Sequence, residues 1–271
     1  MKTSLWAVEF KYVDVFIYME GLVFEFSIMR GDKPLFKGSG VLGGITVIMG
    51  RYWKSTFLRY LFALFAMDYD LAVHTSEEVL SPGGTARLRV GDAFLECGKA
   101  EEDGDVGCSI TYRLKKEVYL LYEGFPLTLR YGLTPPLSPG VADAAARLLQ
   151  LVGDERQGHS SSALLAKALE KAMRQDAWLL IDGLLDGMHP DDVFRLAGLA
   201  SSAKARLVVA THSPWVRRAF RCHRRAAETQ GMPAADKPAT AYEFVDGTVK
   251  NVELVSETYG KAFGKLYEVC G

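Results

Sequence analysis

Residues 45–61 read ITVIMGRYWKSTFLRYL, and this stretch decides the fold class. Its apolar beginning is typical of a buried parallel strand, and its end has the apolar spacing of a helix. A short loop after Gly50 joins the two, and the helix opens with Lys54, Ser55 and Thr56. In such an arrangement backbone N–H groups bind phosphate, the lysine reaches the terminal phosphates, and the hydroxyl holds magnesium. We therefore expect an α/β fold with a nucleotide-binding loop at these four residues.

The loop departs from the usual G-x-x-x-x-G-K-[ST] pattern. Trp53 stands where the second glycine belongs, and the loop after Gly50 is about two residues short. The indole is expected to fill the phosphate space or to cover the cleft, because a glycine lets the backbone approach a phosphate and a tryptophan does not. We therefore expect weak nucleotide binding. On this segment alone, a lysine at an ordinary helix N-terminus is the alternative interpretation.

Two further apolar runs end in polar residues. Residues 178–192 read WLLIDGLLDGMHPDD and place Asp182 at the end of a strand. Residues 206–216 read RLVVATHSPWV and place His212 just after another. The carboxyl ends of parallel strands meet at one edge of a sheet, so we expect both side chains in one polar cleft with Lys54. The alternatives are a capping aspartate and a histidine that bonds locally.

In order and spacing, the three stretches resemble the Walker A, Walker B and switch-histidine motifs of ABC-class ATPases. The runs D-x-x-x-x-G-x-H-P and THSP resemble the branch that contains SMC, RecF and OLD-like proteins. The resemblance covers residues 36–67 and 158–216. It implies a P-loop NTPase fold that binds ATP and magnesium. Ser55 and Asp182 would hold the metal. His212 would lie beside the γ-phosphate, and both His212 and Asp182 would have catalytic roles.

A serine-rich run resembles the signature that this family carries before Walker B. Ser161 and Ser162 are the matching residues, although Ala163 stands where a glycine is usual. A serine cluster is also a good helix N-cap, which is the alternative. ABC heads complete their sites across a dimer, so the resemblance implies a homo- or hetero-oligomer with an ATPase-like chain.

The departures from the family weaken the case for hydrolysis. Gly183 occupies the position of the glutamate that positions water, and glycine has no side chain to polarise it. No glutamine lies between Ser55 and Gly140 to supply the family's Q-loop. Asp186 is the candidate substitute base. We expect a degenerate head with weak or no ATPase activity; a working ATPase with substituted residues is the alternative.

A third hypothesis is a nucleic-acid-binding module. Arginines recur at helical spacing after the THSP run, and such a face can neutralise several DNA or RNA phosphates. A solvated helix face paired with acids is the alternative. The residues are Arg217, Arg218, Arg221, Arg224 and Arg225.

Composition favours a globular cytoplasmic protein. The 271 residues are 49% hydrophobic and 24% charged, with a formal net charge of -1, so the surface as a whole does not attract nucleic acid. The N-terminus lacks a signal-peptide pattern. The most apolar helical run, residues 57–67, is too short to span a membrane. The four cysteines form no C-x-x-C pair and are expected to be buried. The single asparagine is typical of a thermophilic source, in which a Cys97–Cys108 disulfide is conceivable.

The chain divides into three parts of one composite head. Residues 1–67 hold antiparallel strands and the phosphate-binding strand and helix. Residues 68–140 are expected to form an inserted antiparallel β subdomain that ends in a proline-rich linker. Residues 141–271 hold the signature-like helix, the second and third motifs, and a closing hairpin around Asp246-Gly247.

Overall fold

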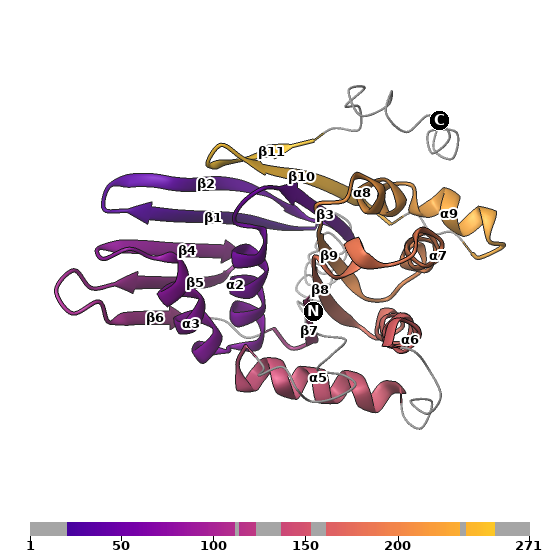
Figure 1. The fold of residues 1–271 in the computed structure, drawn as a ribbon, viewed down its shortest axis with the longest axis horizontal. Helices are drawn as coiled ribbons and strands as arrows, with labels where there is room; N and C mark the ends of the chain where they lie inside the picture. Colours follow the sequence, from indigo (N-terminus) through magenta and orange to yellow (C-terminus); the bar gives the residue numbers. More distant parts are fainter. Residues whose placement is uncertain (1–20, 112–113, 123–136, 153–160, 234–236, 253–271) are drawn as a thin grey trace, which may run out of the picture.

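One mixed sheet runs through the residues that the structure describes. The structure is a computed structural model, and it describes residues 21–111, 114–122, 137–152, 161–233 and 237–252. The order of the strands is β6-β5-β4-β1-β2-β11-β10-β3-β9-β8-β7 (Figure 1). In chain order they are β1 (Leu22–Arg30), β2 (Lys33–Leu42), β3 (Ile45–Gly50), β4 (Gly84–Val90), β5 (Ala93–Lys99), β6 (Val106–Ile110), β7 (Glu117–Tyr122), β8 (Ala177–Asp182), β9 (Arg206–Ala210), β10 (Ala239–Val245) and β11 (Thr248–Asn251).

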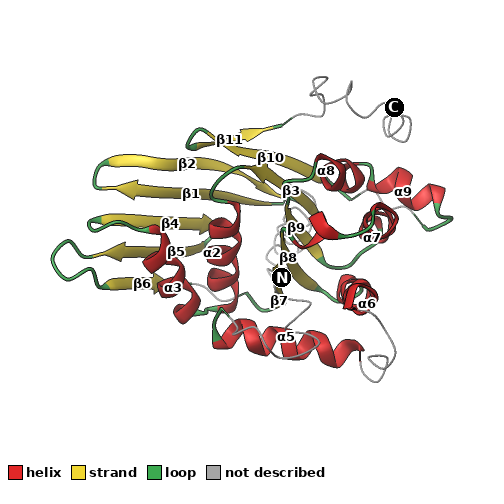
Figure 2. Ribbon diagram, viewed as in Figure 1, coloured by secondary structure: helices red, strands yellow, loops and turns green. Residues whose placement is uncertain are grey.

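Helices cover both faces of the parallel part of this sheet. Strands β10, β3, β9, β8 and β7 pair in parallel, with α2 on one face and α6 and α8 on the other (Figures 1 and 2). The predicted α/β fold class is confirmed. The helices are α2 (Lys54–Ala66), α3 (Tyr69–Val79), α5 (Pro139–Val152), α6 (Ser161–Met173), α7 (Pro190–Ser201), α8 (Pro214–Arg221), α9 (His223–Thr229) and the 3-10 helix η2 (Leu184–Gly187).

The antiparallel half of the sheet differs from the expected insertion in two ways. Residues 68–140 begin with a helix, α3, before the antiparallel strands β4, β5 and β6. Strand β7 does not join those strands; it lies parallel to β8 at the far edge. Its middle four residues are all buried, whereas β4 alternates buried and exposed residues, and continuous burial is what a strand covered on both faces requires.

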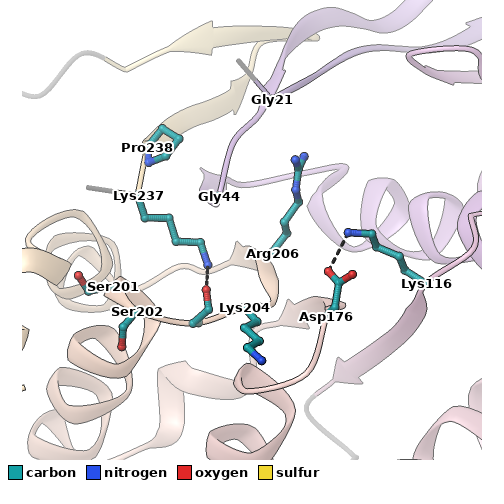
Figure 3. Close-up of a pocket in the computed structure, with 11 residues that line it drawn as sticks. Gly21, Gly44, Lys116, Asp176, Ser201, Ser202, Lys204, Arg206, Lys237 and Pro238 are labelled. Atoms are coloured by element: carbon teal, nitrogen blue, oxygen red, sulfur yellow. Dashed lines mark hydrogen bonds and ion pairs between the residues drawn. The ribbon is translucent and has the colours of Figure 1, made fainter. Parts of the chain in front are cut away.

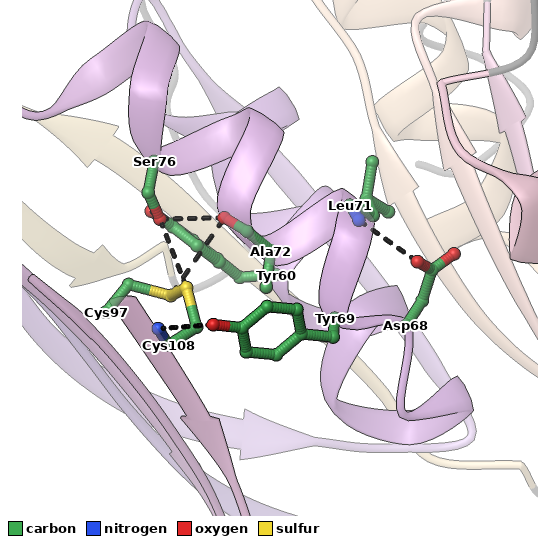
Figure 4. Close-up of a disulfide and its surroundings, with 8 residues drawn as sticks. All are labelled: Tyr60, Asp68, Tyr69, Leu71, Ala72, Ser76, Cys97 and Cys108. Carbon is green, nitrogen blue, oxygen red and sulfur yellow. Dashed lines mark hydrogen bonds between the residues drawn. A yellow bond between two sulfur atoms is a disulfide. The ribbon is translucent and has the colours of Figure 1, made fainter. Parts of the chain in front are cut away.

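A disulfide joins β5 to β6 beneath α3 (Figure 4). Cys97 and Cys108 are direct cross-strand partners, so the bond locks the register of the outer hairpin. Ser76 of α3 lies over it, with its hydroxyl 2.7 Å from the Tyr60 hydroxyl of α2. The conceivable disulfide is therefore present, and these two cysteines are not free thiols.

Two other expected elements are present, with differences in detail. The predicted arginine-rich helix is split at Cys222 into α8 and α9. The closing hairpin is confirmed as β10 and β11, and β10 also extends the parallel sheet beside β3. Residues 1–20 of the predicted N-terminal strands and residues 123–136 of the predicted β subdomain lie outside the described residues, and the three-part division of the chain stays a prediction.

Helix α2 is packed on nearly every side. Its Phe57 has no exposed surface and touches aromatic rings from both halves of the sheet. The ring centroids lie 5.0 Å from Phe24 of β1 and 5.5 Å from Phe244 of β10. This packing fixes the first turn of α2, which carries the candidate phosphate-binding residues.

We predict that Phe57→Ala lowers the free energy of unfolding by about 3–5 kcal/mol, because it opens a cavity among aromatic rings that cannot collapse. Val23→Ala on β1, where the side chain is 57% exposed, is the control and should change it by less than about 0.5 kcal/mol. Guanidinium titration measures both. A loss below about 1 kcal/mol for Phe57→Ala would contradict the central position of this helix.

Candidate nucleotide site

The three predicted polar residues meet at the carboxyl ends of neighbouring strands. Lys54 opens α2 after β3, Asp182 ends β8, and His212 follows β9. The Nζ atom of Lys54 lies 3.1 Å from Nε2 of His212. The Ser55 hydroxyl donates to Oδ1 of Asp182 over 2.9 Å. The structure thus brings the four side chains into one cluster, as parallel strand order requires.

Lys54 is a buried cation that is held from two sides. It is 4% exposed, and its ammonium donates to the carbonyl of Gly50 over 2.5 Å in addition to contacting His212. Burial lowers the pKa of Lys54, while the charges of Asp182 and Asp186 act in the opposite direction. No carboxylate forms an ion pair with it among the described residues, so its charge is only partly balanced.

The amino end of α2 is open to an anion. Trp53, its N-cap, supplies no side-chain hydrogen bond, and its first turn holds no acid. By contrast, Asp68 caps α3, His189 caps α7 and Ser213 caps α8. Uncapped first-turn N–H groups beside a lysine form a favourable environment for a phosphate.

Ser55 and Asp182 fit a magnesium site of the kind that phosphates complete. Both offer oxygen atoms, which magnesium prefers, and they are hydrogen-bonded to each other. The described residues contain no group of three or more His, Cys, Asp or Glu that could hold a metal without help. Magnesium commonly takes one or two protein oxygens and fills its other positions with phosphate and water. Thr56 makes no side-chain hydrogen bond to a described residue.

Asp186 positions the switch-like histidine. Its Oδ2 accepts the backbone N–H of His212 over 2.8 Å, and its Oδ1 accepts the hydroxyl of Thr211. Both carboxylate oxygens are therefore engaged in holding the end of β9. The sequence indicates Asp186 only as a candidate substitute base; Thr211, directly before the histidine, is the residue that signals its positioning role.

Trp53 packs toward the core. Its ring centroid lies 6.4 Å from that of Phe36 of β2, which gives the indole a partner behind the loop. The backbone takes the left-handed conformation, with φ of 70°. A glycine adopts this conformation freely, whereas another residue carries a cost of about 1–2 kcal/mol. The indole's packing supplies a physical reason for keeping a tryptophan there.

Gly50 is needed by the sheet as well as by the loop. It has a φ of 125° and pairs with Phe244 of β10. A Cβ added at this position would lie 2.0 Å from the Phe244 carbonyl oxygen. Close pairing of β3 and β10 therefore requires glycine here whether or not a phosphate binds.

Gly183 directly follows Asp182, at the position where a general base is expected, and has no side chain. It also has a positive φ, 67°, and its N–H donates to Ala210 of β9. A Cβ added there would meet no atom within 4 Å. The space next to Asp182 is thus open.

The signature-like serines and the arginines occupy separate helices. Ser161 and Ser162 form the start of α6, which returns through a short turn to β8. Arg217, Arg218 and Arg221 lie on α8, directly after His212. Burial, followed by the charges of the other two arginines, lowers the pKa of Arg221 to about 10. Arg224 and Arg225 on α9 are exposed.

Comparisons with known proteins find likeness in fold alone. No protein-family model and no curated protein matches the sequence. An SMC head bound to the C-winged helix domain of ScpA is 11% identical, with a TM-score of 0.48, and covers 88% of this chain and 99% of its own. The SMC head domain from Thermotoga maritima is 14% identical, with a TM-score of 0.47, and covers 87% and 99%. A bacterial Atm1-family ABC exporter with ATP bound is 13% identical, with a TM-score of 0.39, over 97% of this chain and 46% of its own.

These values carry no conclusion about activity, which must come from the site itself. Among the described residues, no helix is long and apolar enough to cross a membrane.

We predict that Asp182→Asn stabilises the protein at pH 7. Burial raises the pKa of Asp182 above its ordinary value of 3.8, so its ionised form disfavours the folded state. The penalty is present above the folded-state pKa and disappears as pH falls toward 3.8, because the protonated carboxyl carries no such cost. Denaturant titrations at pH 7 and at lower pH should show a gain for the variant that shrinks on acidification.

Asp186→Asn is the matched comparison. In this variant the NH₂ group of the amide faces one of the two donors from which Asp186 accepts a hydrogen bond. The free energy of unfolding should therefore fall by about 1–3 kcal/mol. Equal stabilisation by both variants would show that general charge, not local burial, controls the site.

Proposed function

We propose that this protein is an ABC-type nucleotide-binding head with weak or no ATPase activity, which acts by association with a partner chain or with itself. The observation that carries the proposal is the convergence of Lys54, Ser55, Asp182 and His212 at the uncapped start of α2. This cluster offers a cation, first-turn N–H groups and two oxygens suited to magnesium, which are the groups that a nucleotide phosphate chain requires.

Each residue has a definable task. Lys54 would leave the Gly50 carbonyl to bind a terminal phosphate, and His212 would donate to the γ-phosphate from its anchored place beside Asp186. Ser55 and Asp182 would part to admit magnesium, which neutralises phosphate charge when bound. The buried Lys54 charge, which no carboxylate of the described residues pairs with, favours an anion at this place.

Two local features support weak or absent turnover. Gly183 has no group to take a proton from an attacking water. The short loop between Gly50 and Lys54 offers fewer N–H groups to a phosphate than a full-length loop does, and charge-assisted hydrogen bonds contribute about 1.5–3 kcal/mol each.

Association is supported by the position of α6. The helix turns back into β8 at its carboxyl end, so its first turn, with Ser161 and Ser162, lies toward the same sheet edge as Asp182. A serine pair at that edge could complete the site of an ATPase-like partner even if this chain hydrolyses nothing.

We predict weak but specific ATP binding by the isolated chain. Titration with a fluorescent ATP analogue, with and without magnesium, should give a dissociation constant above about 100 µM. This value corresponds to a binding free energy of about -5.5 kcal/mol. Lys54→Ala should abolish it, whereas Lys33→Ala at the exposed β1–β2 turn should not. A low-micromolar dissociation constant would refute the prediction of weak binding. Binding that Lys54→Ala leaves unchanged would refute the placement of the nucleotide at Lys54.

We predict that Gly183→Glu creates or raises ATP hydrolysis at saturating ATP. The open space around Gly183 admits a side chain, and a general base contributes about 10²–10⁴-fold. The positive φ will cost about 1 kcal/mol of stability. Gly183→Gln, similar in size but unable to take a proton, should stay at the wild-type level. The prediction is contradicted if the wild-type chain already turns over ATP at roughly 1–10³ per second and Lys54→Ala abolishes this activity. That result would show that the chain hydrolyses ATP without a glutamate at position 183.

A nucleic-acid-binding role is the second candidate, and the mutual repulsion on α8 favours it. Burial, and then the charges of Arg217 and Arg218, lowers the pKa of Arg221 to about 10, so three like charges lie close together on this helix. No described carboxylate pairs with Arg217 or Arg221, so phosphate groups would relieve the repulsion.

The test is salt dependence. Affinity for a duplex oligonucleotide should fall steeply with salt, and replacing Arg217 and Arg221 by Gln should reduce the slope by about two. Replacement of Arg87 and Arg89 on exposed β4 positions is the control. Equal effects from both pairs would assign binding to general charge.

A further inference from the structure

Arg59 lies on the face of α2 that the candidate nucleotide site uses. It follows Ser55 by four residues, and residues at this spacing lie one above the other on a helix. Ser55 is hydrogen-bonded to Asp182 over 2.9 Å, so the stem of Arg59 starts one turn behind that contact. Burial raises the pKa of Asp182, and the Ser55 hydrogen bond and then the charge of Arg59 oppose this rise. Arg59 is thus a cation within electrostatic reach of the carboxylate.

The guanidinium of Arg59 is nevertheless bonded to a different carboxylate. Its Nη1 atom lies 2.5 Å from Oε2 of Glu78 on α3, and the other oxygen of Glu78 lies 3.2 Å from Nε2 of His74. No hydrogen bond joins Arg59 to Asp182, both of which belong to the described residues. The Nε atom of Arg59 is buried and has no hydrogen-bond partner. The side chain therefore keeps a donor for a second acceptor.

Helix α3 holds Glu78 in place. The buried hydroxyls of Tyr60 and Ser76 lie 2.7 Å apart and join α2 to α3 (Figure 4). Tyr60 directly follows Arg59, and Ser76 lies two residues before Glu78, so this contact keeps the two helices together beside the ion pair. The position of the guanidinium thus depends on α3, an element outside the candidate nucleotide site.

Lys237 shows, by contrast, how this protein fixes a buried cation. It lines a cavity of about 570 Å³ at the amino ends of β8, β9 and β10 (Figure 3). Its ammonium donates to the backbone carbonyls of Ala203 and Ala205, between α7 and β9. Arg59 is bonded instead to a side chain, that of Glu78, which is 44% exposed. Arg59 can therefore exchange partners by movement of side chains alone.

The direction of Arg59 matters for a metal at this site. Magnesium bound by Ser55 and Asp182 needs a carboxylate oxygen that no other cation occupies. A guanidinium that pairs with a carboxylate commonly engages both of its oxygens, and its charge repels a divalent cation. While Glu78 neutralises Arg59 and keeps it bonded, the carboxylate of Asp182 stays open to the metal.

We propose that Glu78 holds Arg59 away from Asp182 and thereby leaves this carboxylate to magnesium, so that α3 sets the metal affinity of the candidate nucleotide site. The inference rests on the proposed nucleotide-binding function and adds the residues that regulate its metal. Arg59 and Glu78 are positioning residues, because neither would contact the nucleotide or the metal. Glu78 determines the partner of Arg59, and Arg59 determines the access of the metal to Asp182.

The first experiment compares the affinity of the full chain for a fluorescent ATP analogue with and without magnesium. The ratio of the two affinities is the readout, because a variant that only disturbs folding lowers both. Glu78→Gln should reduce this ratio by at least about threefold, since it frees Arg59 to pair with Asp182. Arg59→Gln should not reduce it, and in the double variant Glu78→Gln should have no further effect. Glu77→Gln removes the same charge from an exposed neighbouring position of α3 and should leave the ratio unchanged.

A second measurement needs neither nucleotide nor metal. Asp182→Asn is expected to stabilise the wild-type chain, because the buried charge of Asp182 has no cation bonded to it. In a Glu78→Gln background Arg59 becomes that bonded cation, so the stabilisation by Asp182→Asn should shrink or reverse. Urea titrations of the wild type, the two single variants and the double variant measure this coupling, and urea does not screen charges as guanidinium chloride does. A Glu77→Gln background should keep the full stabilisation.

Three outcomes overturn the proposal. The magnesium ratio stays at its wild-type value in Glu78→Gln, Glu77→Gln lowers it equally, or Asp182→Asn stabilises the Glu78→Gln chain as much as the wild type. Absence of nucleotide binding in every variant would instead overturn the proposed function. The urea measurement would then still decide whether Glu78 directs Arg59, so the two hypotheses can fail separately.

Discussion

Burial of helix α2 between the two halves of the sheet is the constraint on which the site depends. Phe57 contacts strands from both halves, and so the first turn of the helix cannot shift independently of the sheet. That turn carries Lys54 and Ser55, whose partners come from β8 and β9. The polar groups are therefore placed by apolar packing behind them. A site built in this way has its backbone held in place, so that ligand binding requires movement of side chains only.

Charge is distributed unevenly between the two ends of the parallel strands. At the carboxyl ends, Asp182 and Asp186 lie near the buried Lys54, so cation and anions partly balance. At the amino ends, Lys237 is buried beside Arg206, and Asp176 is paired with Lys116. The balance of charge thus differs between the two ends of the same strands.

The sequence was sufficient for features that depend on neighbouring residues. Apolar strands that end in Asp182 and precede His212 follow from local composition, and their convergence follows from parallel pairing. It was insufficient where distant contacts decide. The parallel placement of β7 depends on pairing with β8, some sixty positions later in the chain, and the direction of the Trp53 indole depends on Phe36 of β2. The cavity around Lys237 joins residues from six separate segments, which no local pattern reveals.

The pairing of Gly50 with Phe244 also sets the order in which the protein can be assembled. Both neighbours of β3 in the sheet, β9 and β10, come from the last third of the sequence. During synthesis, β3 and the loop after it must therefore wait unpaired until those strands leave the ribosome, and such long-range parallel pairing is slow. Throughout that interval the part of α2 that packs on β9, and the side of Phe57 that packs on Phe244 of β10, have no strand to cover them. A nascent chain of this protein is thus exposed to self-association before the loop acquires its shape.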